Sequence, residues 1–446
     1  MDNTLDRLRH GRMEGAQRLD LSCGLSSFPP EIFSLADTLE VLNLSGNALS
    51  ELPDDLPRLH KLKVLFCADN AFTHVPESIG RCAQLSMVGF KANRIAQLSP
   101  RALPPALRWL ILTDNQLEAL PDELGHCTQL QKLMLAGNRL RTLPDSLQHC
   151  HRLELLRISA NRLTALPDWL TRMPHLSWLA YAGNPFCEAD ENRAMAASQA
   201  HQIDWSSLRI EQQLGEGASG VIHKATWQRD GQPTPVAVKL FKGAMTSDGL
   251  PDCEMAACIA ADAHPHLIHV HGRISGHPEG RVGLVMQRID DSFRNLADPP
   301  SLASCTRDVY APDSAFELGA LVTLAQGLAS AGAHLHAHGI LHGDLYAHNT
   351  LHNAQGQCLL GDFGAASFLP FAAPAQARAL AALEVRAFGH LLEELLIRCQ
   401  QPAQPPGMLS KLHTLQARCT LADAMARPSL HEVSQALDAL VAELPH

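Results

Sequence analysis

Two short stretches in the second half of the chain combine carboxylate and amide side chains at close spacing. The octet "HGDLYAHN" at residues 342–349 carries Asp344 and Asn349, and "LLGDFGAAS" follows it with Asp362, thirteen residues after Asn349. Carboxylate and amide oxygens are hard donors of the kind that Mg²⁺ prefers, above all where nucleotide phosphates complete its coordination. Both stretches therefore hold residue types that could take part in phosphate chemistry.

A glycine-rich stretch lies upstream of these residues. "LGEGASGVI" follows a GxGxxG pattern, with Gly215, Gly217 and Gly220 between two strand-like runs. Glycines there let backbone N–H groups approach phosphate oxygens without a Cβ in the way. The pattern alone is weak, since such glycine triplets also mark dinucleotide sites and ordinary hairpins.

The strand after the glycines strengthens this interpretation. "VAVKL" alternates as a strand and presents Lys239 nineteen residues after Gly220, the order expected of a phosphate-binding lysine behind a glycine-rich loop. Such a lysine needs a carboxylate to orient it. The next helical segment, "DCEMAACIAADAHPHL", offers Glu254 as the first choice and Asp252 as the second. Further along, "VGLVMQRI" is predicted to be a buried strand, and "LGALVTLAQGLASAGAHLHAHG" a helix that leads into the octet.

In this order the motifs resemble the eukaryotic-type protein kinase fold, two-lobed and α+β, over about residues 206–446. The resemblance implies ATP and Mg²⁺ as cofactors, with Asp344 accepting the proton of the substrate hydroxyl and Asn349 and Asp362 binding the metal. Lys239 would hold the α and β phosphates. The adenine would lie among four apolar side chains, of Ile222, Ala237, Leu351 and, at the hinge, Met286.

The sequence departs from that family around the octet and downstream of it. Gly343 stands where many protein kinases have an arginine that receives a phosphate from the activation segment, so switching by loop phosphorylation is not expected. The segment itself, "DFGAASFLPFAAP", is short, and Ser367 is its only hydroxyl. "APA" replaces the usual APE, which removes the expected carboxylate partner of Arg427. Glu384 stands where an aspartate commonly anchors the catalytic loop.

Two further departures bear on the mechanism. Tyr346 occupies the position of the serine/threonine-kinase lysine, and His348 the position where tyrosine kinases often have an arginine. A protonated His348 could neutralise part of the charge of the transition state, which predicts a slow enzyme favoured at lower pH. The leading hypothesis is a protein kinase, with serine or threonine as the acceptor. A catalytically weak pseudokinase scaffold and a small-molecule phosphotransferase, which can also use an HGD loop, are the alternatives.

The first half of the chain is a repeat array. Asparagines recur every 22 or 23 residues inside a common frame, as in "LEVLNLSGNALSELPDDL" and "LQKLMLAGNRLRTLPDSL". The series is Asn47, Asn70, Asn93, Asn115, Asn138, Asn161 and Asn184. One such unit cannot bury its apolar face alone, so the units must stack into a curved solenoid. The frame resembles the leucine-rich repeat family, an α/β solenoid.

The strands of these repeats are expected to present an apolar stripe on their concave side. Its members are Val41, Val64, Phe66, Met87, Trp109, Ile111, Met134, Leu155 and Trp178. Exposed apolar stripes of this size mark interaction surfaces, and a separate protein partner or substrate is favoured over contact with the rest of the chain or a second copy.

Composition limits the remaining classes of function. The 446 residues have 46% hydrophobic and 18% charged content with a net charge of −10, which fits globular domains and gives no basic footprint for nucleic acid. No apolar run approaches the length of a membrane span, and the twelve scattered cysteines form no CxxC pair. We therefore expect a soluble, bacterial-like leucine-rich-repeat protein kinase in the cytoplasm, or alternatively a secreted effector. The predicted domains are a solenoid of about eight repeats with caps at residues 1–187, a cap helix and linker at 188–205, and a kinase domain at 206–446.

Overall fold

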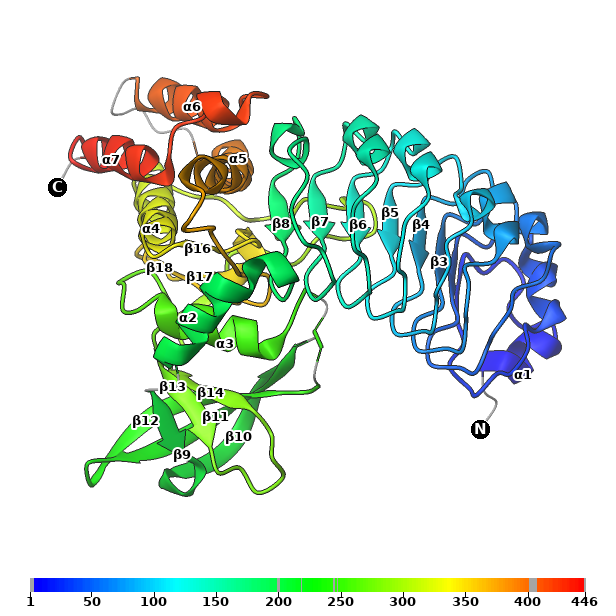
Figure 1. Ribbon diagram of the computed structural model, residues 1–446, viewed down its shortest axis with the longest axis horizontal. Coiled ribbons are helices and arrows are strands. Elements are labelled where there is room, and N and C mark those ends of the chain that lie inside the picture. The colour runs from blue at the N-terminus through cyan, green and yellow to red at the C-terminus, as the bar shows by residue number, and fades with distance from the viewer. Residues whose placement is uncertain are drawn as a thin grey trace. The chain divides into compact units, whose positions relative to one another are not determined.

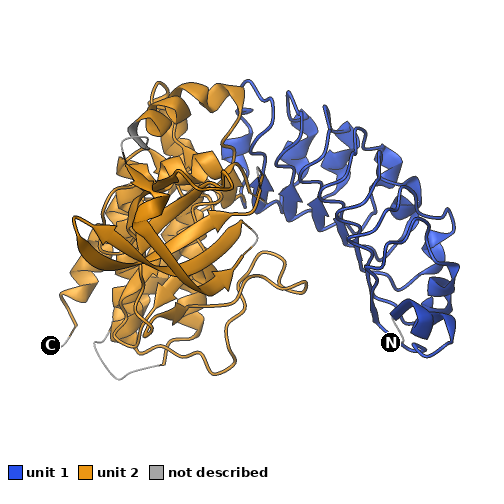
Figure 2. Ribbon diagram, turned by 90° about the horizontal axis from the view of Figure 1, so that it is seen from below, with its two compact units in different colours: residues 1–175 blue, residues 176–446 orange. Residues whose placement is uncertain are grey.

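The computed structural model describes residues 4–198, 201–217, 219–243, 245–246, 248–400 and 407–444. The chain divides into two compact units, Met1–His175 and Leu176–His446 (Figure 2). The predicted boundaries at 187 and 205 differ from this division, because β8 (Trp178–Ala180), the strand of the last repeat, groups with the second unit. Residues 199 and 200 of the predicted linker lie outside the described part.

The first unit is a solenoid of three-residue parallel strands with 3₁₀ helices on the other side of each coil (Figure 1). The strands are β1 (Arg18–Asp20), β2 (Val41–Asn43), β3 (Val64–Phe66), β4 (Met87–Gly89), β5 (Trp109–Ile111), β6 (Lys132–Met134) and β7 (Leu155–Arg157). The 3₁₀ helices are η1 (Pro30–Leu35), η2 (Leu56–Arg58), η3 (Glu77–Arg81), η4 (Pro100–Ala102), η5 (Asp122–His126), η6 (Asp145–His149) and η7 (Leu170–Arg172). Helix α1 (Thr4–Arg9) precedes them and buries Leu5 and Leu8.

The repeated asparagines link each coil to the one before it. Asn138 donates from Nδ2 to the carbonyl oxygens of Leu112 and Leu135, both at 2.9 Å, and its Oδ1 accepts from the N–H of Leu117 at 3.0 Å. Asn138 itself is 6% exposed, so these bonds satisfy backbone groups that water cannot reach. The 23-residue period thus has a physical cause, because every coil needs one such bridge.

The outward side chains of the strands differ in their exposure. Phe66, Trp109, Ile111 and Met134 are partly exposed, and the rings of Phe66 and Trp109 lie 6.4 Å apart. Four other predicted members of the apolar stripe are nearly inaccessible, at 5% for Val64, 2% for Met87, 3% for Leu155 and 1% for Trp178. Contrary to the prediction, these four offer no free surface to a partner.

The second unit begins with β8 and helix α2 (Glu188–Ser198) and continues into a sheet-rich lobe. The strand order in its sheet is β10 (Leu208–Glu216), β11 (Gly220–Arg229), β12 (Gln232–Phe241), β14 (Gly283–Gln287), β13 (Val270–Ser275) and β9 (Gln202–Asp204). Helix α3 (Pro251–Ala260) packs against β13, and α2 packs against α3. Part of the predicted linker is therefore built into this lobe, since β9 pairs in parallel with β13 at its edge.

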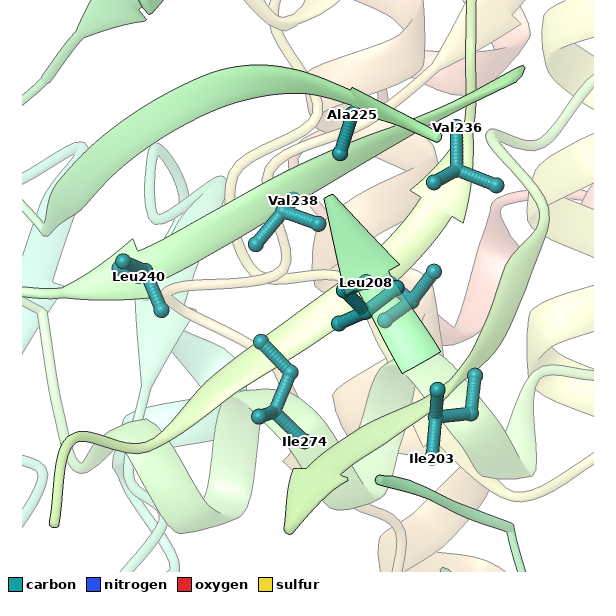
Figure 3. Packing of buried hydrophobic residues seen from close by; sticks show 8 residues of the cluster. Ile203, Leu208, Ala225, Val236, Val238, Leu240 and Ile274 are labelled. Atoms are coloured by element: carbon teal, nitrogen blue, oxygen red, sulfur yellow. The ribbon is translucent and has the colours of Figure 1, made fainter. Parts of the chain in front are cut away.

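Apolar side chains on one face of this sheet hold the strands together (Figure 3). Val236 and Val238 of β12 are fully buried and meet Ala225 of β11 and Ile274 of β13. The alternation of β12 thereby places Lys239 on the opposite face, because successive side chains of a strand point to opposite sides.

The second lobe is mainly helical. Its helices are α4 (Leu318–Ala337), α5 (Pro374–Ile397), α6 (Met408–Cys419) and α7 (Leu430–Val441). Short strand pairs lie beside them: β15 (Arg294–Asn295), β17 (Thr350–His352) and β18 (Cys358–Leu360), and β16 (Ile340–Leu341) with β19 (Ser367–Phe368). Among the described helices, α4 alone has the length and apolar composition of a membrane span, and 61% of its most apolar window is buried inside the protein.

Candidate active site

A buried ion pair joins strand β12 to helix α3 in the sheet-rich lobe. Lys239 Nζ on β12 lies 2.5 Å from Glu254 Oε1 on α3, and the two residues are 8% and 3% exposed. Burial opposes the charge of Lys239, but the carboxylates of Glu254 and Asp362 outweigh it and raise the pKa of the lysine. Burial raises the pKa of Glu254 to about 7 against the effect of Lys239. Asp252, the second candidate, instead pairs with Arg273 at 3.3 Å.

The glycine-rich loop joins β10 to β11 beside this pair. A Cβ at Gly215 or Gly217 would meet no protein atom within 4 Å, so both glycines border open space. At Gly220 a Cβ would come within 2.5 Å of the carbonyl oxygen of Leu240, so glycine is required by the close approach of β12. Lys242 holds the loop by contacts to Glu216 Oε1 at 2.6 Å and the Gly217 carbonyl at 3.0 Å. No motif singled out Lys242 in advance.

The four predicted adenine contacts come from both lobes. Ala237 on β12 lies opposite Met286 on β14 in the strand register, and Ile222 on β11 lies opposite Lys239. Leu351 lies on β17 in the helical lobe. Ile222, Met286 and Leu351 are partly exposed, as expected of side chains that leave room for a ligand.

The three predicted polar residues lie in two connected segments, since the N–H of Gly361, next to Asp362, donates to the carbonyl of Asn349 at 3.0 Å. Asn349 Nδ2 donates to Asp344 Oδ2 at 2.8 Å and to the Asp344 carbonyl at 2.9 Å. The amide oxygen of Asn349 is then the atom that remains for a cation. Asp362 is exposed, has φ +54°, and accepts the N–H of Gly364 at 3.2 Å.

These residues fit a magnesium–nucleotide complex. Within the described residues, no three or more His, Cys, Asp or Glu side chains gather to hold a metal ion, so Asn349 and Asp362 would need phosphate oxygens as further ligands. The open space at Gly215 and Gly217 is the place where a Cβ would obstruct those phosphates. Glu254 Oε2 is buried without a hydrogen-bond partner among the described atoms, and it faces Gly364 in the DFG turn.

A buried carboxylate anchors the catalytic loop from helix α5. Glu384, 2% exposed, accepts the N–H of Gly343 at 2.7 Å and that of His342 at 3.3 Å. His336 Nε2 lies 2.8 Å from the same carboxylate. Burial alone would raise the pKa of Glu384, but the hydrogen bond to His336 and its charge outweigh burial and lower it. Glu384 thus anchors the catalytic loop, the role that its position in the sequence suggested. No sequence motif had indicated that His336 would contact this carboxylate.

His348 has a carboxylate partner that the sequence did not reveal. Its Nδ1 lies 2.7 Å from Asp308 Oδ1, and its N–H donates to Asp308 Oδ2 at 3.0 Å. Burial alone would lower the pKa of His348, but the hydrogen bond to Asp308 and the charges of Asp344 and Asp308 outweigh it and raise the pKa. The raised pKa extends the protonated form of His348 toward neutral pH.

The short activation segment is held without a phosphate. β19 pairs with β16 directly before the catalytic loop, and α5 begins at Pro374. Ser367 has no exposed surface and accepts a backbone N–H at its hydroxyl, so a protein kinase has no access to it. Arg427, 5% exposed, donates to the carbonyls of Ala382 and Leu421, both at 2.8 Å, in place of a carboxylate. Burial lowers the pKa of Arg427 to about 10.

Gly343 occupies a position that admits no side chain. Its φ is +73°, and a Cβ would lie 2.4 Å from the Ala365 carbonyl oxygen and 2.8 Å from that of Leu179. We expect Gly343→Ala to lower the free energy of unfolding by about 2 kcal/mol or more, because left-handed backbone strain and overlap add. Gly339→Ala is the matched control, since Gly339 has φ +70° with no atom within 4 Å of a Cβ. Urea denaturation that gave both variants the same loss would contradict the crowding at Gly343.

Comparisons with known proteins agree with this geometry. Residues 208–386 match the family model described as protein tyrosine and serine/threonine kinase. Residues 105–163 and 128–186 match a leucine rich repeat model, and residues 38–59 match a second one. The predicted combination of a repeat solenoid with a kinase-like fold is therefore confirmed.

Curated relatives match part of the chain at low identity. Ephrin type-A receptor 8 of Mus musculus is 26% identical over 58% of this chain and 29% of its own length. Ephrin type-B receptor 3 of Danio rerio is 29% identical over 42% of this chain and 35% of its own length. Ephrin type-B receptor 4 of Homo sapiens is 25% identical over 58% and 29%. The chain thus spans about a third of the length of these relatives.

Proposed function

We propose, from the premise that this chain joins leucine-rich repeats to a protein kinase domain, that it transfers the γ-phosphate of ATP to a serine or threonine hydroxyl of a protein. The observation that carries the proposal is the joint presence of four groups in one domain. Lys239 is paired and oriented by Glu254, and Asp344, Asn349 and Asp362 lie around the catalytic loop. A scaffold that never handled Mg-ATP would have no need of the buried charges of Lys239 and Glu254, which are costly in isolation.

Each of these residues has a distinct task in this mechanism. Lys239 binds the α and β phosphates, held in place by Glu254. Asn349 and Asp362 bind Mg²⁺, which neutralises charge on the phosphates when it is present. Asp344 accepts the proton of the acceptor hydroxyl, and the hydrogen bond from Asn349 fixes the direction of its carboxylate. His348, whose protonated form Asp308 favours, supplies positive charge near the transferring group when it is protonated.

The short activation segment supports serine or threonine as the acceptor. β19 pairs with β16 immediately before the catalytic loop, and in this proposal an acceptor rests on this segment near Asp344. A close approach suits the short side chains of serine and threonine better than the longer side chain of tyrosine. The family model covers both acceptor classes, so this part of the proposal rests on the segment alone.

A small-molecule phosphotransferase is the second candidate, and the same segment favours it. With α5 beginning at Pro374, little of the chain is left to form a platform for an extended peptide. The two candidates are separated by incubating the protein with Mg-ATP and mixed protein acceptors, followed by phosphoamino-acid analysis. Phosphoserine or phosphothreonine supports the proposal. Phosphotyrosine would show that the acceptor is tyrosine and not serine or threonine. ATP turnover with small alcohols but no labelled protein supports the second candidate.

The repeats of the first unit are proposed to hold the protein partner or substrate. Their partly exposed stripe contains Phe66 and Trp109, and Lys132 Nζ lies 4.3 Å from the centre of the Trp109 ring. Aromatic side chains beside a cation are enriched among residues that dominate binding energy. This proposal would connect the solenoid to acceptor choice rather than to the chemical step.

We expect the double variant Phe66→Ala/Trp109→Ala to raise KM for an intact protein acceptor about tenfold or more. The comparison is the ratio of kcat/KM for that protein to kcat/KM for a short peptide around its phosphorylated residue. The ratio should fall in the variant, since a short peptide lacks the parts of the protein that would bind the solenoid stripe. A constant ratio would contradict a role of the stripe in holding the substrate.

A further inference from the structure

The strand of the last repeat lies against the catalytic loop inside the second unit. Trp178 of β8 is 1% exposed, and its ring is stacked on Tyr346 with centroids 4.2 Å apart and planes inclined by 7°. Its indole Nε1–H donates to the carbonyl of Leu345 at 3.1 Å. Leu345 and Tyr346 are the two residues that follow Asp344. One side chain of a repeat therefore fixes the backbone and the ring next to the proposed base.

Two histidine rings extend this aromatic contact, one in the catalytic loop and one on helix α5. The Tyr346 ring lies 4.9 Å from the His348 ring, and His390 of α5 lies 5.6 Å from the Trp178 ring. Arg307 covers the Trp178 ring at 5.2 Å. Trp178 is thus the centre of an aromatic stack that reaches from α5 to the histidine near the transferring phosphate.

Three residues further on, Tyr181 contacts the activation segment. Its backbone N–H donates to Ser367 Oγ at 3.0 Å, and its hydroxyl donates to the Phe368 carbonyl at 3.0 Å. Tyr181 is 1% exposed, so both bonds are shielded from water. Since Ser367 and Phe368 form β19, the last repeat fixes this strand by contacts to a side chain and to the backbone.

The lack of a side chain at Gly343 allows β8 to lie close to the catalytic loop. The carbonyl oxygen of Leu179 would lie 2.8 Å from a Cβ at residue 343, closer than real Cβ contacts allow. Any residue other than glycine would displace either the repeat or the loop. The departure of Gly343 from the arginine of other kinases is therefore linked to the docking of β8.

We propose that Trp178 and Tyr181 of the last repeat are positioning residues of the phosphotransfer site, holding the catalytic loop and the activation segment in place of a phosphorylated segment. This inference rests on the proposed kinase function. It assigns the end of the repeat array a task within the catalytic unit, distinct from partner binding. Neither residue touches the reacting atoms. They act through Tyr346 and through β19.

The first test is kinetic and uses the full-length protein. We expect Trp178→Ala to lower kcat about ten- to a hundredfold, the size expected when a catalytic group is misplaced by about 1 Å. KM for ATP should stay within about twofold, because Trp178 contacts the catalytic loop, α5 and Arg307, while Lys239 and the glycine-rich loop belong to the sheet from β10 to β12. Trp178→Phe keeps a ring over Tyr346 and should remain within about fivefold of the parent protein.

Trp169→Ala is the matched control. Trp169 is also a buried repeat tryptophan, 7% exposed with Nε1 donating to Asp145 at 2.9 Å, but it lies in the first unit. Its loss should change thermal stability without changing kcat. A kcat for Trp178→Ala within about twofold of the parent protein, in a folded variant, would overturn the proposal.

Hydrogen exchange tests the same idea without requiring activity. Trp178→Ala should accelerate exchange in residues 342–349 about tenfold or more, and Tyr181→Phe should do so at residues 367–368, while Trp169→Ala changes neither segment. Unchanged exchange in both segments would overturn the proposal. If the parent protein transferred no phosphate, the proposed function would fail, and the exchange measurement would still decide whether the repeat holds the two loops.

Discussion

Replacing Asp344 with asparagine is expected to lower kcat by about 10²- to 10⁴-fold, the usual contribution of a positioned general base. Asparagine has the same shape and can still accept the hydrogen bond that Asn349 Nδ2 donates to Asp344 Oδ2 at 2.8 Å. The variant should therefore fold normally and bind Mg-ATP with unchanged affinity. The measurement is single-turnover transfer to a protein acceptor, beside nucleotide binding by titration calorimetry.

The control for this change is Asp230→Asn. Asp230 lies in the turn between β11 and β12 with φ +52°, a conformation that asparagine also adopts readily. This variant carries the same chemical change in the same unit, outside the catalytic loop, and should keep the parent rate. A loss of less than about threefold in Asp344→Asn would show that the carboxylate is not the base.

Lys239→Met is expected to have the second large effect, on both activity and stability. Phosphotransfer should fall by about a hundredfold or more, since one preorganised cation on the phosphates is lost. The free energy of unfolding should fall by about 3 kcal/mol at alkaline pH, where Glu254 is left as a buried and unpaired carboxylate. Chemical denaturation of the parent protein and the variant measures this difference.

The loss of stability in Lys239→Met should depend on pH in a defined direction. The pKa of Glu254 is already raised to about 7 in the folded protein, from an ordinary value of 4.5, and removal of Lys239 raises it further. In both proteins the raised folded pKa destabilises the folded state as pH rises above about 4.5, but the parent reaches its full penalty near pH 7. The deficit of the variant therefore grows only above about pH 7, toward its own higher folded pKa. The deficit should therefore shrink as pH is lowered from 8 to 5.

The double variant Lys239→Met/Glu254→Leu separates the two effects. It should recover most of the stability without recovering activity, because no charge is left buried. A deficit of Lys239→Met that did not change with pH, or that persisted in the double variant, would contradict the assigned pair.

Local sequence patterns predicted those parts of the molecule that depend on neighbouring residues. The asparagine period specified the solenoid, since each coil bonds only to adjacent coils, as at Asn138. The glycine-rich pattern and Lys239 are close for the same reason, because they lie on adjacent antiparallel strands with Ile222 opposite Lys239. Lys239 pairs with Glu254, the first choice, while Asp252 contacts Arg273, because two residues along α3 turn a side chain by roughly 200°.

The features that the sequence did not reveal depend on contacts between distant segments. Asp308 reaches His348 from forty residues away, and His336 reaches Glu384 from 48 residues away, both outside any motif. Trp178 was predicted to lie on an open concave face, but the catalytic loop covers it, and Leu345 of that loop lies 167 residues further along the chain. Periodicity gives the face of a strand and not the segment that packs on it.

The measurement that tests the central claim most directly is transfer of γ-labelled phosphate from Mg-ATP to a protein acceptor by the full-length chain. The account predicts label in serine or threonine that depends on Mg²⁺ and disappears in both Lys239→Met and Asp344→Asn, while Asp230→Asn retains it. Binding of Mg-ATP with no transfer to any protein acceptor, or transfer that persisted in both variants, would contradict it.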